Sequence, residues 1–234
     1  MRNRFDEQLR QLKLDMIRMS SLCETAITVT MQNMLSSDQV YTLDDSEEAF
    51  QQLQNIKNTY EKAGFLKEEI DQMERQVENQ CMKLLLHQQP VAKDLRCVSS
   101  ALKMISDMER IGDQADDIAE IILSRGDRLL TADGTLRAMA RAAIRMVSES
   151  VDAYVRQDVA LAERVIASDD EVDEDFERIK RRLIDGISSG TEDGESVLDL
   201  VMIAKYYERI ADHATNIAEW VEFSVTGVHK TEIT

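Results

Sequence analysis

The sequence contains few residues that interrupt a helix or favour a strand. Its 234 residues include one proline and eight glycines, and aromatic residues account for 5% of the chain. Alanine, leucine, glutamate, arginine and lysine recur instead, and these residues favour helices, whereas strands draw on aromatic and β-branched side chains. The composition therefore argues against a sheet-based fold and predicts long helices.

Basic residues are also scarce, with 28 against 45 acidic ones and a formal net charge of −17. Nucleic acids bind to basic surfaces, so this balance excludes a nucleic-acid-binding role. It also disfavours anionic lipid unless a local basic patch exists. No apolar run approaches the roughly 20 residues that span a bilayer, and the N-terminal "MRNRFDEQLRQ" lacks the apolar segment of a secretion signal. We therefore expect a cytoplasmic protein without membrane insertion.

The chain has only three cysteines, Cys23, Cys81 and Cys97, and none of them form a CxxC pair. An odd number of cysteines does not suit a disulfide framework, and their spacing does not match a zinc site. We expect all three thiols to be reduced and buried as small hydrophobic side chains.

The remaining pattern predicts an all-α protein of six long helices. The last helix is expected to begin at an N-cap, Ser196, and Pro90 closes the second, which Gly64 kinks or breaks. The predicted helices cover residues 3–36, 46–87, 91–125, 134–157, 159–187 and 194–226.

An internal repeat organises the chain. "ERIGDQADDIAE" begins at residue 109 and "ERIADHATNIAE" begins 99 residues later, with eight of twelve positions identical. Upstream, the same offset aligns Asp71 with Asp170, whereas a shift of three residues aligns Asp71 with Asp173, and both registers stay open. We predict two tandem, duplicated three-helix bundles with antiparallel neighbours. Residues 1–128 form the first, 133–226 the second and 227–234 a C-terminal tail.

Each copy of the repeat carries an acidic stripe. At ~100° per residue, Glu109 and Asp113 lie on one line of a helix, and the apolar Ile105 precedes them on that line. The second copy places Glu208 and Asp212 in the same way. A stripe that begins apolar and becomes acidic indicates a functional face, although an ordinary solvated face remains an alternative.

Clustered carboxylates repel one another and are stabilised by a proton, an arginine or a cation. Carboxylates are hard ligands that suit magnesium, manganese, calcium, iron and at times zinc. The preceding helix of each bundle adds candidate ligands, which are Asp71, Glu74, Asp170 and Asp173. A ferritin-like di-iron site needs Glu-x-x-His, which the sequence lacks. We interpret His213 as a surface or packed histidine.

Motifs of catalysis are missing from the sequence. It has no glycine-rich phosphate loop and no Cys-His arrangement with a recognisable context. Gly112, which faces Ala211 in the repeat alignment, is expected to permit close helix packing. We therefore predict that the protein is not an enzyme.

The repeated segments resemble the PhoU family of phosphate-signalling proteins. "QQPVAKDLRCVSSALKMISDMERIGD" is similar to the first repeat of that family and "SVLDLVMIAKYYERIAD" to the second. The resemblance implies two three-helix bundles that bind multinuclear iron or zinc clusters, with magnesium or manganese as alternatives. The residues that match its metal-binding motifs are Glu109, Asp113, Asp117, Glu208, Asp212 and Asn216. Because Asn216 stands where the first copy has Asp117, a weaker second site is expected.

The resemblance also implies a function. Family members are non-enzymatic cytosolic regulators that link a phosphate ABC transporter, through its PstB-type ATPase, to a PhoR-type sensor kinase. They repress phosphate-starvation genes, restrain phosphate uptake and are expected to form homodimers. An accessory protein of another phosphate or ion transporter, or a carboxylate-bridged metalloenzyme, remains an alternative. About 25 residues near 38–64 are expected to have no family counterpart.

Overall fold

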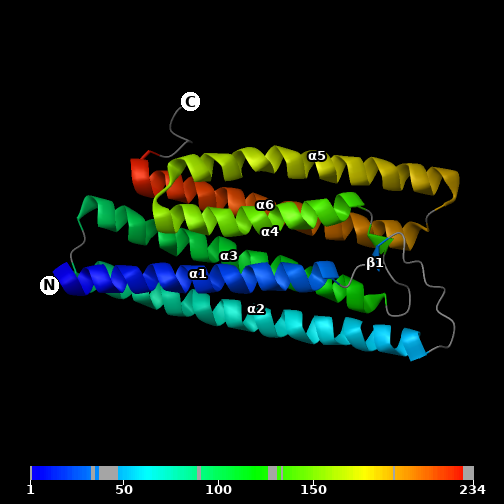
Figure 1. Cartoon of the computed structure of the whole chain (residues 1–234), viewed down its shortest axis with the longest axis horizontal. Helices are drawn as coiled ribbons and strands as arrows, with labels where there is room; N and C mark the ends of the chain where they lie inside the picture. Colours follow the sequence, from blue (N-terminus) through cyan, green and yellow to red (C-terminus); the bar gives the residue numbers. More distant parts are fainter. Residues whose placement is uncertain are drawn as a thin grey trace.

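The computed structural model confirms an all-α fold (Figure 1). It describes residues 2–32, 35–36, 47–88, 91–125, 131–132, 134–191 and 193–228. Its helices are α1 (Arg2–Gln32), α2 (Glu47–Gln88), α3 (Ala92–Ser124), α4 (Gly134–Arg156), α5 (Val159–Ser189) and α6 (Gly194–Thr226). Two short strands, β1 (Leu35–Ser36) and β2 (Thr131–Ala132), pair in parallel.

The ends of the predicted helices agree with the structure apart from three details. The first helix ends at Gln32 rather than at residue 36, and β1 follows it. The N-cap of α6 is Asp193, whose side chain accepts a hydrogen bond from the Ser196 backbone N–H, so the predicted N-cap is wrong. At Gly64 a kink or a break was predicted, and there is no break, because α2 runs through Gly64 as one helix. A single helical glycine costs only about 1 kcal/mol, which the packing of the helix offsets.

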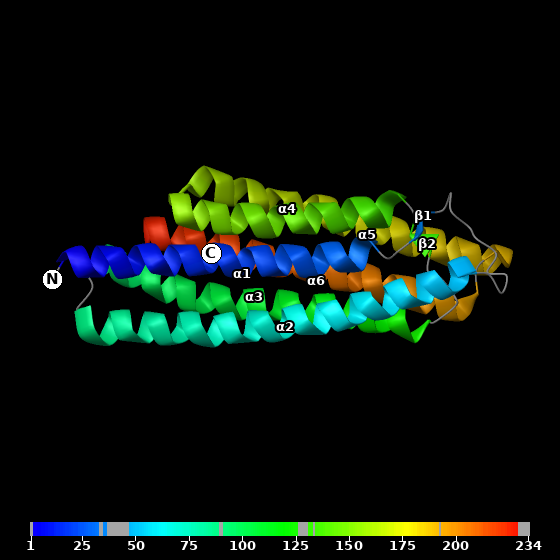
Figure 2. The ribbon, with the colours of Figure 1, turned by 60° about the horizontal axis from the view of Figure 1, so that its bottom comes forward.

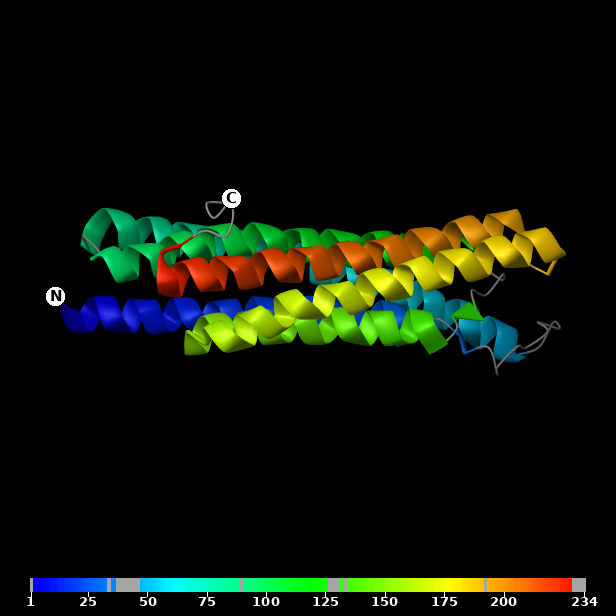
Figure 3. The same cartoon turned by 90° about the horizontal axis from the view of Figure 1, so that it is seen from above.

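The six helices run along one long axis, with α1, α2 and α3 in one half and α4, α5 and α6 in the other (Figures 1 and 2). The halves meet where α3 packs along α6 and where α1 lies beside α4 (Figure 3). Buried apolar residues from all six helices form one continuous core. The two repeated motifs, on α3 and α6, therefore lie together in the middle of the molecule. No helix in the described ranges is long and apolar enough to cross a bilayer.

The cysteines are buried and unpaired, as predicted. Burial raises the pKa of Cys81 to about 12 and that of Cys23 further still. Burial also raises the pKa of Cys97, whose Sγ lies 3.2 Å from the Tyr154 hydroxyl. Thiols with raised pKa values are poor nucleophiles, so these side chains serve the core.

The structure distinguishes the two registers of the repeat. Lys67 of α2 contacts Asp113, whereas Asp169 of α5 lies beside Asp212, the counterpart of Asp113. Lys67 and Asp169 are 102 residues apart, while Asp113 and Asp212 are 99 apart. The shift of three residues is therefore the register that matches α2 with α5, and it makes Asp173 the counterpart of Asp71.

Gly112 permits close packing of α3 on α2, as expected. A Cβ at this position would lie 3.0 Å from Ile70 Cδ1 and 3.3 Å from Ile70 Cγ2. In the second half the counterparts of Gly112 and Ile70 are Ala211 and Val172, both buried. At the matching positions, the second half thus has one carbon more on α6 and one carbon fewer on α5 than the first half has on α3 and α2.

We predict that the effect of Gly112→Ala depends on residue 70. In the native chain the added methyl overpacks Ile70 and is expected to lower the free energy of unfolding by about 1 kcal/mol, the overpacking outweighing the better helix propensity. In an Ile70→Val background the same change is expected to stabilise, as in the second half. Urea unfolding of the wild type, both single variants and the double variant measures this coupling. Losses that simply add would contradict it.

Candidate functional site

A first acidic cluster lies between α2 and α3. Lys67 Nζ lies 3.0 Å from Asp113 Oδ1 and 3.8 Å from Asp71 Oδ2, so one lysine joins carboxylates of both helices. Glu74 of α2 and Glu109 of α3 are close enough to influence each other's charge. The structure therefore brings together four residues that the sequence proposed as metal ligands.

The carboxylates of the first cluster are crowded and partly removed from water. Burial raises the pKa of Glu109, and the negative charges of Asp113, Glu74 and Asp71 raise it further. Burial also raises the pKa of Glu74. Burial likewise raises the pKa of Asp116, against the lowering effect of Lys67. Buried Oδ1 atoms of Asp71 and Asp116 have no hydrogen-bond partner, so Lys67 alone does not satisfy this cluster.

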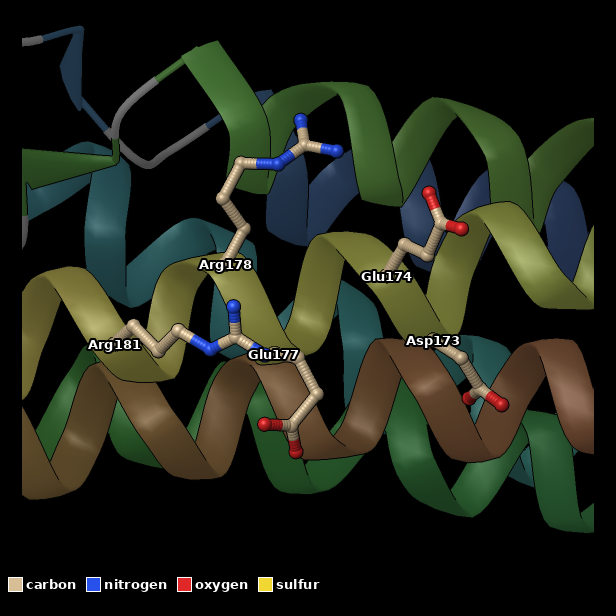
Figure 4. Close-up of a pocket in the computed structure, with 5 residues that line it drawn as sticks. All are labelled: Asp173, Glu174, Glu177, Arg178 and Arg181. Carbon is tan, nitrogen blue, oxygen red and sulfur yellow. The ribbon is translucent and has the colours of Figure 1, made fainter.

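A second acidic cluster lies between α5 and α6 and contains Asp169, Asp173 and Asp212. Burial, helped by Asp212 and Asp173, raises the pKa of Asp169 from 3.8 to about 6. Glu208 forms an ion pair with Lys205. In Figure 4, Asp173 and Glu177 point from α5 toward α6, whereas Glu174 and Arg178 point toward α4. The carboxylates on the α6 side of α5 are thus distinct from those on its α4 side.

Asp169 was not predicted from the sequence, which pointed to its neighbour Asp170 instead. Asp170 is exposed, and of the two side chains it is Asp169 that faces Asp212. The sequence does contain a signal for Asp169. When α5 is aligned with α2 by the three-residue shift, Asp169 and Asp173 take the positions of Lys67 and Asp71. At the position that Lys67 occupies in the first cluster, the second cluster has the carboxylate Asp169. Repulsion between like charges is therefore stronger in the second cluster.

We predict that Asp169→Asn stabilises the metal-free protein at neutral pH. A carboxyl whose pKa is higher folded than unfolded opposes folding, and this penalty grows between about pH 4 and pH 6 and is full above that. A shift from 3.8 to about 6 corresponds to about 3 kcal/mol. Partial exposure reduces this to about 1–2 kcal/mol. Urea unfolding in chelator should show the gain at pH 7.5 and none at pH 4.

Glu163→Gln is a matched control, because Glu163 is an exposed carboxylate of the same helix. It removes the same charge from α5 and is expected to change the free energy of unfolding by less than about 0.5 kcal/mol. An equal gain in both variants would trace the effect to net charge, and a gain that persists at pH 4 would contradict the role of ionised Asp169.

The third residue of each predicted metal-binding motif, Asp117 on α3 and Asn216 on α6, points across the interface between these two helices. Asp107 Oδ1 lies 2.9 Å from His213 Nδ1 and accepts a hydrogen bond from Asn216 Nδ2 at 3.2 Å. Asp117 lies beside the Tyr206 hydroxyl, which opposes the rise that burial causes in its pKa. His213 is thus a packed histidine. A groove of roughly 440 Å³ lies here, lined by Arg110, Gln114, Arg209, Asp212, His213 and Asn216.

The donor chemistry of both clusters fits a cation. Carboxylate oxygens bind hard and borderline cations, and the raised pKa values and orphaned oxygens show that positive charge is in short supply. In the described part of the chain, no three His, Cys, Asp or Glu side chains converge tightly enough to hold an ion as they stand. Binding would therefore require new rotamers.

The second half of α5 also carries a shallow hollow (Figure 4), lined by Asp173, Glu174, Glu177, Arg178 and Arg181. Arg178 lies 3.0 Å from Asp175, and Lys180 lies 2.7 Å from Glu177. Ion pairs between residues three positions apart on one helix are typical of a solvent-exposed helix face. We assign no binding role to the hollow.

Comparisons with known proteins agree with this architecture. The model of the PhoU domain matches residues 40–122 and 136–221. It covers most of segment 38–64, so the expectation that this segment has no family counterpart is wrong. The crystal structure of PhoU from Pseudomonas aeruginosa superposes with a TM-score of 0.81 at 26% identity and covers 96% of this chain and 100% of that one.

Curated relatives share most of their length with this chain. A phosphate-specific transport system accessory protein PhoU homolog of Synechocystis is 32% identical over 233 residues, which cover 97% of this chain and 93% of the relative. A homolog of the same description from Clostridium acetobutylicum is 30% identical over 95% of this chain and 94% of its own. Two family-model matches and these relatives show that the chain belongs to the PhoU family.

Proposed function

We propose that the protein is a non-enzymatic cytoplasmic regulator of phosphate homeostasis. It couples a phosphate ABC transporter, through a PstB-type ATPase, to a PhoR-type sensor kinase, represses phosphate-starvation genes and restrains phosphate uptake. The observation that carries this proposal is the pair of repeated motif helices packed along one another at the centre of the molecule. The curated relatives are named as accessory proteins of phosphate-specific transport systems.

The contact between the halves suits a regulator. Across α3 and α6, Asp107 joins His213 and Asn216 through polar contacts beside an open groove. These polar contacts can exchange for water, whereas the apolar core that both halves share would have to slide without opening. Packed helices that slide or rotate against one another are a known means of signalling. The two halves are therefore the elements that would shift.

Iron or zinc is the cofactor that we propose for the two clusters, in multinuclear form, with magnesium or manganese as alternatives. Glu109, Asp113, Asp71 and Glu74 would hold it in the first cluster. Glu208, Asp212, Asp173 and Asp169 would hold it in the second. A bound cation would supply the positive charge that the carboxylates lack and would fix α2 on α3 and α5 on α6. No catalytic step is involved.

Binding to the two partners tests the function. The full chain, immobilised, is expected to bind the transporter ATPase or the cytosolic part of the sensor kinase from the same organism. Deleting its gene is expected to raise a phosphate-starvation reporter in ample phosphate. Failure to bind either partner, together with an unchanged reporter, would reject the proposal and favour an accessory role for another transporter. Sedimentation of the same preparation measures the homodimer that we propose.

A further inference from the structure

The groove between α3 and α6, which we call the α3–α6 groove, lies where the two repeated motifs meet. Its volume is roughly 440 Å³. It is lined by Arg110, Gln114, Arg209, Asp212, His213 and Asn216, all of them polar or charged. Pockets for drug-sized molecules and cofactors are lined mostly by apolar and aromatic side chains. The α3–α6 groove therefore suits a small polar ligand better than a nucleotide.

The two helices that form the groove are related by a local two-fold axis. On one side of this axis, Asp107 accepts a hydrogen bond from Asn216. On the other side, Asp117 lies beside the Tyr206 hydroxyl. Adding or subtracting the repeat offset of 99 converts one pair into the other. The axis therefore places matched residues of the two halves around the same groove.

One arginine from each half lines the groove. Arg110 and Arg209 are counterparts in the repeat, and both are exposed. Among the side chains that the structure describes, neither guanidinium has a carboxylate at ion-pair distance. The nearby Asp107 contacts His213 and Asn216 instead. Two positive charges without an ion-pair partner on one groove repel each other and attract an anion.

The groove also offers hydrogen-bond acceptors, which an anion without a proton would not satisfy. Gln114 is 9% exposed, and its Oε1 has no hydrogen-bond partner among the described residues. The last torsion of a glutamine side chain is broad, so this amide can turn toward the groove. The Asp212 carboxylate lines the groove as well. Guanidinium donors and these acceptors together fit an oxyanion that carries its own proton.

Inorganic phosphate meets both requirements, because at neutral pH it keeps at least one hydroxyl. Its other oxygens accept parallel hydrogen bonds from guanidinium groups, and its hydroxyl donates one. Sulfate has no hydroxyl at neutral pH. It would leave the Gln114 oxygen unpaired and would meet Asp212 as a like charge.

We propose that the α3–α6 groove binds inorganic phosphate. Arg110 and Arg209 hold its oxygens from opposite halves of the molecule, and Gln114 or Asp212 accepts its proton in a hydrogen bond. Because the anion contacts both halves, phosphate favours the arrangement of α3 and α6 that brings the two arginines together. The choice of phosphate among protonated oxyanions rests on the proposed function, whereas the oxyanion site itself does not. The protein would then sense phosphate directly.

Equilibrium dialysis of the full chain against radioactive phosphate, at constant ionic strength, tests the proposal. Saturable binding in the millimolar range or below is expected, and unlabelled sulfate is expected to compete about tenfold less well or worse. Arg110→Gln/Arg209→Gln is expected to weaken binding about tenfold or more. Arg141→Gln/Arg145→Gln is the matched control, because it removes two exposed arginines one turn apart on α4 and is expected to bind phosphate normally. Circular dichroism confirms that both variants fold.

Gln114→Met distinguishes a phosphate site from a general anion site. Methionine has a similar size but no oxygen to accept the phosphate proton. The preference for phosphate over sulfate is expected to fall several-fold, whereas the affinity for sulfate is expected to change little. An unchanged preference would overturn the role given to Gln114.

The outcomes separate this proposal from the proposed function. If the wild type binds no phosphate, or if sulfate competes equally well, the inference is wrong, while partner binding still decides the proposed function. Phosphate binding that persists in Arg110→Gln/Arg209→Gln would overturn it too and would place the anion elsewhere, such as on a cation of the acidic clusters. AMP that competes much better than phosphate would make a nucleotide the ligand instead. If phosphate binds as expected and neither partner does, the groove assignment stands and the proposed function fails.

Discussion

Removing metal from the purified protein is expected to lower its melting temperature by at least about 5–10 °C. A cation present at 100 times its dissociation constant stabilises the folded state by about 2.7 kcal/mol per site. For a chain of this length each kcal/mol corresponds to roughly 2–4 °C. The effect has its origin in the crowded carboxylates, since burial raises the pKa of Glu109, Glu74 and Asp169 and a cation would offset that penalty. Differential scanning calorimetry with chelator, and after zinc or iron is restored, measures the shift.

A variant of four motif residues separates specific binding from general attraction to an acidic chain. Glu109→Gln, Asp113→Asn, Glu208→Gln and Asp212→Asn together are expected to remove the bound metal, seen by elemental analysis, and the thermal shift. The same number of exposed acids can be neutralised as the control, using Glu163, Glu171, Glu174 and Asp185 of α5. If wild type and control carry no metal after growth with iron and zinc, the clusters are not metal centres and would serve instead as surfaces for basic partners.

The helices could be predicted from the sequence because their signals are local. A scarcity of proline and glycine and a period of 3.6 residues act within one segment, whatever surrounds it. Local reasoning failed at Ser196, and at Gly64 it allowed a break that the helix does not have. The cost of a helical glycine is small beside the packing of a long helix, and Asp193 is an N-cap as good as serine that lies three residues earlier.

The candidate site could be predicted only in part, because it depends on the register between helices. The spacing of Glu109 and Asp113 is fixed within α3, so their shared face was predicted. Which residue of the preceding helix contacts them depends on the length of the connection between the two helices. The alignment of α5 with α2 is shifted by three residues relative to that of α6 with α3, so Asp169 was not predicted. Only the structure reveals that Asn216 faces Asp107.

Arg125 is a further residue that the sequence did not single out. It follows the last turn of α3, and its side chain is 5% exposed. Its Nε lies 3.2 Å from Asp199 Oδ2, one of its terminal nitrogens lies 3.4 Å from Glu195, and it donates a hydrogen bond to Ser196. These partners all lie in the first two turns of α6. A single buried guanidinium therefore joins the end of one motif helix to the start of the other.

We predict that Arg125→Leu lowers the free energy of unfolding by about 2–3 kcal/mol. Breaking a buried ion pair costs about 3–5 kcal/mol because it leaves the other charge unpaired. The exposure of Glu195 reduces this value. Burial already raises the pKa of Asp199, and Arg125 opposes that rise, so Asp199 is the charge that the variant would leave uncompensated. Urea unfolding at pH 7 measures the loss.

Two companion variants identify the cause of that loss. Arg125→Leu/Asp199→Leu is expected to recover most of the stability, since an apolar pair of similar size replaces a buried ion pair at little cost. Arg156→Leu is the matched control, because Arg156 pairs with Asp152 at 2.9 Å on the surface and is expected to contribute less than about 0.5 kcal/mol. If the double variant is no more stable than Arg125→Leu, the stabilisation comes from the packing of the arginine stem rather than from its charge. The two motif helices would then be joined by apolar contact alone at this end.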